Sequence, residues 1–150
     1  MGIFDKLKKI VAKREERKIA PPSRYEPTPN REPEVEPVSI PETTCQELYA
    51  AMRAGEDVTL LDVRRAWDHE AQHPIGSVSL PLDELPHRLD ELDPSKRYVL
   101  SCYHGYTSLD GAAFLMDKGF TDVQSLKGGF SHWASAGLPI EGKYADQQDD

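Results

Sequence analysis

One segment of the chain reads Tyr98-Val99-Leu100-Ser101-Cys102-Tyr103-His104-Gly105-Tyr106-Thr107-Ser108. Its first four residues predict a buried strand that runs directly into Cys102. A helix is expected after the segment, because apolar residues recur at helical spacing before Gly119: Leu109, Ala112, Ala113, Leu115 and Met116. Strand, loop and helix in this order are the unit from which α/β domains are built.

Strands and helices are expected to alternate on both sides of this unit. Residues 58–63 and 123–126 predict further buried strands, and residues 77–80 predict a short strand that ends at a proline. Helices are expected over residues 44–52, 82–92 and 130–134, the first of them beginning with a capping box, Thr44 to Glu47. We therefore expect an α/β domain around a parallel sheet over residues 42–142.

Composition and charge divide the rest of the chain. The 150 residues carry 18 Lys and Arg and 26 Asp and Glu, a formal net charge of -8. Nucleic-acid binding needs clustered basic side chains, so this balance argues against a nucleic-acid partner. Residues 1–20 predict a basic amphipathic helix, residues 21–41 a proline-rich extended linker, and residues 143–150 an acidic tail.

Residues 1–18 have a basic face and an apolar face, the latter made by Ile3, Phe4, Leu7, Ile10 and Val11. Such a helix is expected to lie on an anionic membrane surface or to dock on an acidic protein partner; the alternative is a solvated terminal helix. No apolar run is long enough to span a bilayer, no secretory signal is recognisable, and two cysteines fit a reducing compartment. We expect a cytoplasmic protein, with membrane association through this helix left open.

Cys102 is the residue on which chemistry is expected. It lies at the carboxyl end of a predicted parallel strand, where open α/β sheets bind their ligands. The loop amides and the following helix aim N–H dipoles inward and favour a thiolate, a nucleophile. Gly105 lets the loop curl, and Thr107 and Ser108 are expected to supply hydroxyl donors and a helix cap. Cys45, in contrast, lies on an apolar helical stripe and is expected to be structural.

Residues 43–141 resemble a single-domain rhodanese, a member of a sulfurtransferase family. Five segments carry the resemblance in the family's order: Leu61-Asp62-Val63-Arg64; Trp67-Asp68-His69-Glu70 with His73-Pro74-Ile75-Gly76-Ser77; Leu80-Pro81-Leu82; Cys102-Tyr103-His104-Gly105; and Lys127-Gly128-Gly129-Phe130 with Trp133. The resemblance implies a rhodanese-like fold, with a central parallel sheet of about five strands and helices on both faces.

The resemblance also implies a sulfur-transfer cycle. Cys102 would take the outer sulfur of thiosulfate or a related donor, hold it as a persulfide, and pass it to cyanide or a thiol. The backbone amides of the loop would hold the substrate, which assigns substrate binding to Tyr103, His104, Gly105, Tyr106, Thr107 and Ser108. The alternative is a rhodanese-like module for binding or for sulfur and redox sensing, tethered by the N-terminal helix.

Several residues are given supporting roles or none. Asp62 and Arg64 are expected to form a buried ion pair that braces the loops, and His73 to support them by hydrogen bonding. Many rhodaneses carry Arg within or just after the loop, where this chain has Tyr106 and Thr107. Ser108 takes the place of the Arg that cysteine phosphatases need to clamp phosphate.

Two further expectations concern metals and tryptophans. None of the five histidines has metal-ligand spacing with either cysteine, so we expect no metal and no cofactor. Trp67 and Trp133 are expected to pack in the core or at its rim.

Overall fold

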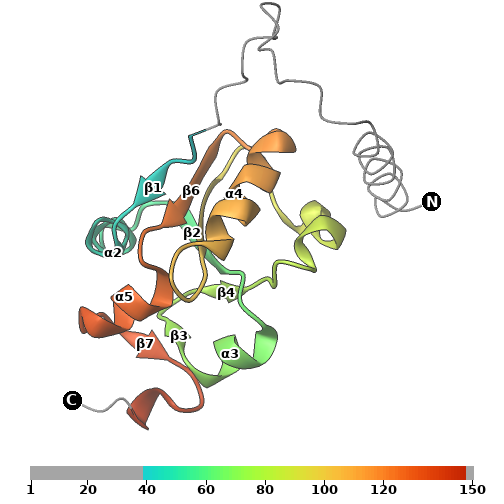
Figure 1. Ribbon diagram of the computed structural model, residues 1–150. Coiled ribbons are helices and arrows are strands. Elements are labelled where there is room, and N and C mark those ends of the chain that lie inside the picture. Colours follow the sequence, from blue (N-terminus) through green and yellow to red (C-terminus); the bar gives the residue numbers. More distant parts are fainter. Residues whose placement is uncertain (1–38, 148–150) are drawn as a thin grey trace, which may run out of the picture. The chain divides into compact units, whose positions relative to one another are not determined.

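The computed structural model describes residues 39–147, which form a five-stranded sheet flanked by helices (Figure 1). All neighbouring strands are parallel, and their order is β1-β6-β5-β2-β4. The strands are β1 (Glu42–Thr43), β2 (Val58–Asp62), β4 (Val78–Ser79), β5 (Arg97–Ser101) and β6 (Asp122–Leu126). The expected parallel sheet is thus confirmed. The helix expected over residues 1–20 and residues 21–38 of the linker expected over 21–41 lie outside the described residues.

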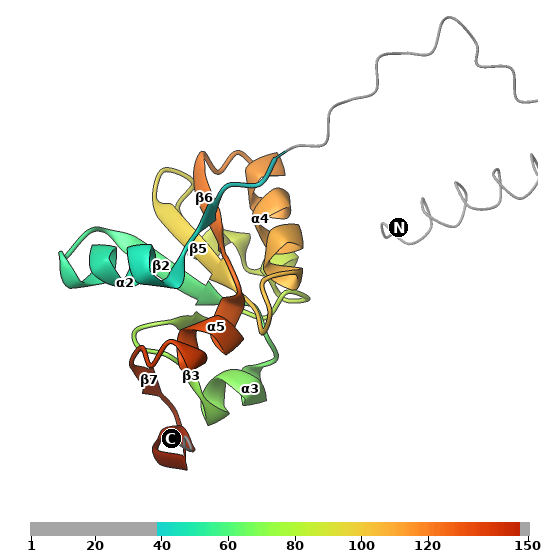
Figure 2. The same cartoon turned by 60° about the vertical axis from the view of Figure 1, so that its left-hand side comes forward.

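Helices cover both faces of the sheet, as expected (Figure 2). They are α2 (Cys45–Arg53), α3 (Ala66–Ala71), α4 (Thr107–Asp117) and α5 (Gly129–Ser135). Alternate strand residues feed two apolar clusters, because successive side chains of a strand point to opposite faces. Leu61 and Leu100 pack with Leu115 of α4, whereas Val99 packs with Leu48 of α2 and Trp133 of α5.

Local sequence signals explain the start of α2. The Thr44 side chain accepts the backbone N–H of Glu47, and the Glu47 carboxylate accepts the backbone N–H of Thr44, which confirms the predicted capping box. Among residues 39–147, no helix has the length and apolar character needed to cross a membrane.

The prediction of a single helix over residues 82–92 is wrong. The segment forms two short 3-10 helices, Leu85–His87 and Leu89–Glu91. A continuous α-helix would need an N–H at Pro86 to bond the carbonyl of Leu82, and proline has none. Tight i to i−3 bonds form instead, such as that from the Arg88 N–H to the carbonyl of Leu85 at 3.2 Å.

The C-terminal part folds back along α3. Strand β3 (His73–Pro74) pairs antiparallel with β7 (Ile140–Glu141). The N–H groups of Lys143 and Tyr144 then bond the carbonyls of Glu70 and Ala71, both at 2.9 Å, before a last 3-10 helix, Ala145–Gln147. The segment expected to be an acidic tail from residue 143 therefore begins with residues that hydrogen bond to the domain.

Candidate active site

Cys102 lies at the carboxyl edge of the sheet, between the end of β5 and the start of α4. Its side chain is buried, with 4% of the residue exposed. The backbone N–H of Gly105 donates to Sγ at 3.0 Å, and the hydroxyl oxygen of Ser108 lies 3.4 Å from the same sulfur. The loop thus curls around its own cysteine and brings the Gly105 N–H and the Ser108 hydroxyl to the sulfur.

The segment that begins α5 contacts the backbone of the loop. Gly105 has a φ of +92°, and a Cβ there would lie 2.9 Å from the N atom of Gly128. The N–H of Phe130 donates to the carbonyl of Cys102 at 2.8 Å. A side chain on Gly129 would collide with that same carbonyl. Because Gly105 and Gly129 have no side chains, the backbone of the loop and the backbone at the start of α5 can come into direct contact.

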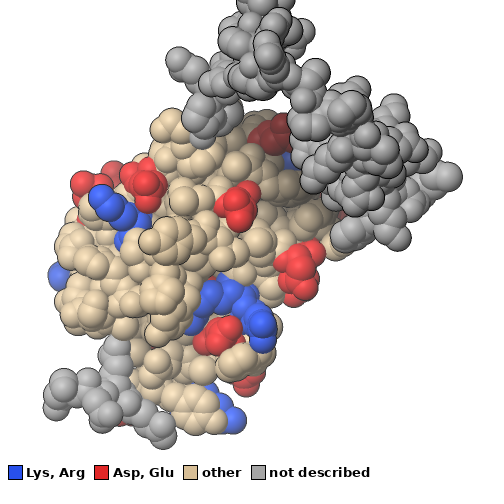
Figure 3. Space-filling model, in the orientation of Figure 1, with Lys and Arg blue, Asp and Glu red and all other residues tan. Residues whose placement is uncertain are grey.

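A hollow of about 440 Å³ opens beside Cys102. It is lined by Val63, Arg64, Arg65, Asp68, Cys102, Tyr103 and Thr107. Figure 3 shows basic and acidic groups side by side near α3 on this face. Arg65, which precedes α3 and belongs to no sequence motif, brings a cation to this hollow from outside the loop.

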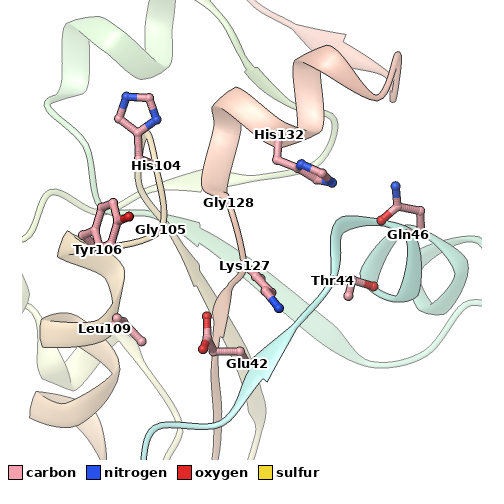
Figure 4. A pocket seen from close by; sticks show the side chains of 10 residues that line it. All are labelled: Glu42, Thr44, Gln46, His104, Gly105, Tyr106, Leu109, Lys127, Gly128 and His132. Carbon is pink, nitrogen blue, oxygen red and sulfur yellow. The ribbon is translucent and has the colours of Figure 1, made fainter.

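The other loop side chains lie around a second hollow, of about 570 Å³ (Figure 4). His104, Gly105 and Tyr106 line it together with Lys127 and His132. This larger hollow does not contain Cys102. The predicted loop residues are therefore divided: Tyr103 and Thr107 share the hollow of Cys102, and Ser108 is fully buried.

The start of α4 differs from the expectation in one respect. Its N-cap residue is Tyr106, and no side chain caps the helix. Neither Thr107 nor Ser108 acts as the cap. The Ser108 hydroxyl instead faces Cys102 and lies 2.7 Å from the hydroxyl of Ser125. A hydroxyl bonded to a buried sulfur is not available to the helix end.

Asp62 is the centre of a buried polar cluster. Arg64 donates to it from Nη2 at 2.8 Å and from Nε at 3.0 Å, so the expected ion pair is present. Arg64 also donates to the carbonyl of Gln72 at 2.6 Å and lies over the Phe130 ring, 4.5 Å from its centroid. These contacts fix the guanidinium against the segment that carries the loop.

Two stacked histidines complete this cluster. His69 Nδ1 lies 3.0 Å from Asp62, and burial lowers the pKa of His69 while the bond to Asp62 opposes that shift. The His73 ring stacks on it with centroids 3.8 Å apart. His73 itself bonds the carbonyl of His69 at 2.6 Å and lies 3.3 Å from Glu141. His73 does not line the hollow of Cys102. The bond between His69 and Asp62 has no signal in the sequence, because the two residues belong to different elements.

Cys45 is placed in the apolar cluster with Leu48 and Trp133. Burial raises the pKa of its thiol to about 11, so it is protonated at neutral pH and poorly suited to be a nucleophile. Trp133 is fully buried, whereas Trp67 is 62% exposed and does not belong to the core. Within residues 39–147, no three His, Cys, Asp or Glu side chains gather in a way that could hold a metal ion.

Comparison with known proteins identifies the family to which this domain belongs. The family profile described as a rhodanese-like domain matches residues 44–136. The chain belongs to this family. Its members include curated relatives named thiosulfate sulfurtransferase GlpE. The one from Actinobacillus pleuropneumoniae serotype 7 (strain AP76) is 39% identical over 90 residues, which cover 60% of this chain and 83% of the relative.

Further relatives extend the match. The GlpE of Glaesserella parasuis serovar 5 (strain SH0165) is 37% identical over 67% of this chain and 92% of its own length. Among solved structures, a rhodanese-related protein from Thermoplasma volcanium gives a TM-score of 0.62 at 26% identity, over 67% of this chain and 97% of its own. A thiosulfate sulfurtransferase from Pseudomonas aeruginosa gives 0.64 at 27% identity, over 73% of this chain and 24% of its own.

Proposed function

We propose that this rhodanese-like domain is a thiosulfate sulfurtransferase that carries sulfur on Cys102. The observation that carries the proposal is the position of the Cys102 sulfur, which accepts the Gly105 N–H at 3.0 Å and borders a hollow lined by arginine. Backbone donors aimed at a sulfur favour its anionic form, which is the nucleophilic one. The names of the GlpE relatives support the same activity.

In the first half-reaction, the thiolate of Cys102 attacks the outer sulfur of thiosulfate. A new sulfur–sulfur bond forms on the cysteine, the sulfur–sulfur bond of thiosulfate breaks, and its electron pair leaves with sulfite. The enzyme is left with an anionic persulfide. Charge is conserved, since a monoanion and a dianion give a monoanion and a dianion. No proton has to move, so no general base is required.

In the second half-reaction, cyanide or a thiolate attacks the outer sulfur of the persulfide. The bond to the acceptor forms, the cysteine sulfur–sulfur bond breaks, and its electron pair returns to Cys102. With cyanide the product is thiocyanate. The donors that hold the resting thiolate also stabilise it as the leaving group, so one set of hydrogen bonds serves both steps.

Arg65 is the proposed partner of the sulfonate end of thiosulfate. The loop has no arginine of its own, and Arg64 is bound to Asp62 and to the carbonyl of Gln72. Arg65 lines the same hollow as Cys102, and among residues 39–147 no carboxylate lies within ion-pairing distance of it. It is therefore able to pair with an anion there. Tyr103 and Thr107, in the same hollow, are proposed to contact the substrate.

The basic segment 1–18, outside the described residues, is proposed to hold the domain at an anionic membrane surface in the cytoplasm. Co-sedimentation with anionic and neutral vesicles compares the full chain with residues 39–150. Pelleting of the full chain by anionic vesicles alone supports the proposal. Equal and negligible pelleting of the full chain and of residues 39–150 contradicts it and favours an acidic protein partner.

The activity is tested by measuring thiocyanate formed from thiosulfate and cyanide. Cys102→Ser should abolish it, and Cys45→Ser is the matched control that should retain it. A wild-type protein that forms no thiocyanate with thiosulfate would contradict the proposal and favour a sensing or binding module. Full activity of Cys102→Ser would remove Cys102 from the mechanism.

A further inference from the structure

A pair of buried serine hydroxyls connects Cys102 to strand β6. The Ser108 hydroxyl oxygen lies 3.4 Å from the sulfur, and the Ser125 hydroxyl oxygen lies 2.7 Å from that of Ser108. Both serines are 0% exposed. Ser125 stands opposite Leu100 in the pairing of β6 with β5. The three side chains therefore form a hydrogen-bonded row in which both hydroxyls are closed to solvent and the sulfur end borders the hollow.

The protons of this row can be arranged in two ways, since each hydroxyl has one proton to donate. When Cys102 is a thiolate, Ser108 donates to the sulfur and Ser125 donates to Ser108. When Cys102 is a thiol, the S–H donates to Ser108, Ser108 donates to Ser125, and the Ser125 proton needs another acceptor. Within residues 39–147, Ser108 is the hydrogen-bond partner of the Ser125 hydroxyl, and no second one accompanies it.

We propose that Ser125 is a positioning residue that acts through Ser108 to favour anionic sulfur at Cys102. A buried donor without an acceptor is unfavourable, so the thiol form leaves the row unsatisfied and the thiolate form satisfies it. The Gly105 N–H donates to the same sulfur at 3.0 Å, which adds a second fixed donor. Ser125 belongs to a strand outside the active loop, and no loop motif includes it.

The consequence for turnover rests on the proposed function. When an acceptor takes the outer sulfur, the electron pair of the breaking bond returns to the sulfur of Cys102. A leaving thiolate departs faster when it is better stabilised. While Ser108 donates to this sulfur, its own oxygen accepts the Ser125 proton. Without the Ser125 hydroxyl that oxygen is left unpaired, so the Ser108 donor is held less well and discharge of the persulfide should slow.

Three substitutions separate the effect of losing the Ser125 hydroxyl from the effect of changing the side-chain volume. Ser125→Val and Ser125→Thr have the same shape, and only the second keeps a hydroxyl; Ser125→Ala removes the hydroxyl without adding volume. Discharge of the preformed persulfide by cyanide is followed in a single turnover. We expect Ala and Val to slow it by about threefold to tenfold and Thr to restore most of the rate. Equal rates for Thr and Val, or a wild-type rate for Ala, would overturn the proposal.

A second readout needs no sulfur donor, so it separates this proposal from the proposed function. The rate of Cys102 alkylation by iodoacetamide at neutral pH, followed by peptide mass spectrometry, reports thiolate reactivity directly. We expect the same order, with Thr faster than Val. In a Ser108→Ala background, Ser125→Ala should have no further effect, because its route to the sulfur is gone. An additive effect there, in variants whose thermal melts match, would contradict action through Ser108.

Discussion

The backbone N–H of Phe130 donates to the carbonyl oxygen of Cys102 across 2.8 Å, and the next amide, that of Ser131, donates to Tyr103 across 2.9 Å. The first turn of α5 therefore carries the active loop. This contact requires the backbone of Gly129 to approach the loop more closely than any residue with a side chain allows. The position of Cys102 thus depends on a segment that follows it in the chain after one helix, α4, and one strand, β6.

Gly129→Ala should displace the loop and remove most sulfurtransferase activity, because its Cβ would collide with the carbonyl of Cys102. Gly137→Ala is the matched control. Both glycines have positive φ, +57° and +72°, but a Cβ on Gly137 meets nothing within 4 Å. The control should lose about 1 kcal/mol of stability to backbone strain and keep its activity. Urea unfolding and thiocyanate assays test both; equal activity of the two variants would show that the contact is dispensable.

Arg65→Glu should raise the KM for thiosulfate by about tenfold or more with a smaller change in kcat, since it replaces the proposed anion partner by a like charge. Arg65→Lys should lie between this variant and the wild type. Lys96→Glu makes a similar change in charge next to the first residue of β5, at the opposite end of that strand from Cys102. An equal rise in KM for Lys96→Glu would point to net charge and not to Arg65.

Asp62→Ala should lower the free energy of unfolding by about 3 kcal/mol or more, because the buried Arg64 guanidinium loses its carboxylate. The comparison is Glu91→Ala, which removes the exposed partner of Arg88 and should change stability little. Urea denaturation measures both. Similar losses in the two variants would mean that the Asp62 cluster contributes no more than a surface pair.

Stability above pH 9 should depend on Cys45. Burial raises the pKa of its thiol from the ordinary 9.0 to about 11, so the folded protein binds this proton more tightly than the unfolded chain. Stability from this group is therefore complete below pH 9 and is lost as the pH rises from 9 to 11. Cys45→Ala should show a shallower fall in unfolding free energy over that range. Parallel curves for the two proteins would contradict the assignment.

The parallel sheet, the Thr44 cap and the position of Cys102 could be predicted because each leaves a local pattern. Buried parallel strands give short apolar runs, and a capping box has a fixed spacing. Helix α3 could not be predicted in the same way. None of its residues is buried, so it has no apolar stripe, and β3 and β7 are each two residues long, too short for a periodic signal.

The site residues that sequence reasoning missed come from elements distant from the loop. Arg65 reaches the hollow from the residue before α3, and Ser125 reaches Ser108 from β6. Each is a polar residue without a motif, and only the packing of separate elements brings it to Cys102. The loop itself could be predicted as a unit, but only its folded course shows that Tyr103 and Thr107 line one hollow while His104, Gly105 and Tyr106 line the other.

A persulfide on Cys102 would be visible in the intact mass of the reduced protein after incubation with thiosulfate. We expect a gain of one sulfur atom that maps to Cys102, persists in Cys45→Ser, is absent in Cys102→Ser and disappears when cyanide is added. Sulfur found on Cys45, or no added sulfur in a folded wild-type protein, would contradict a thiosulfate-derived persulfide on Cys102.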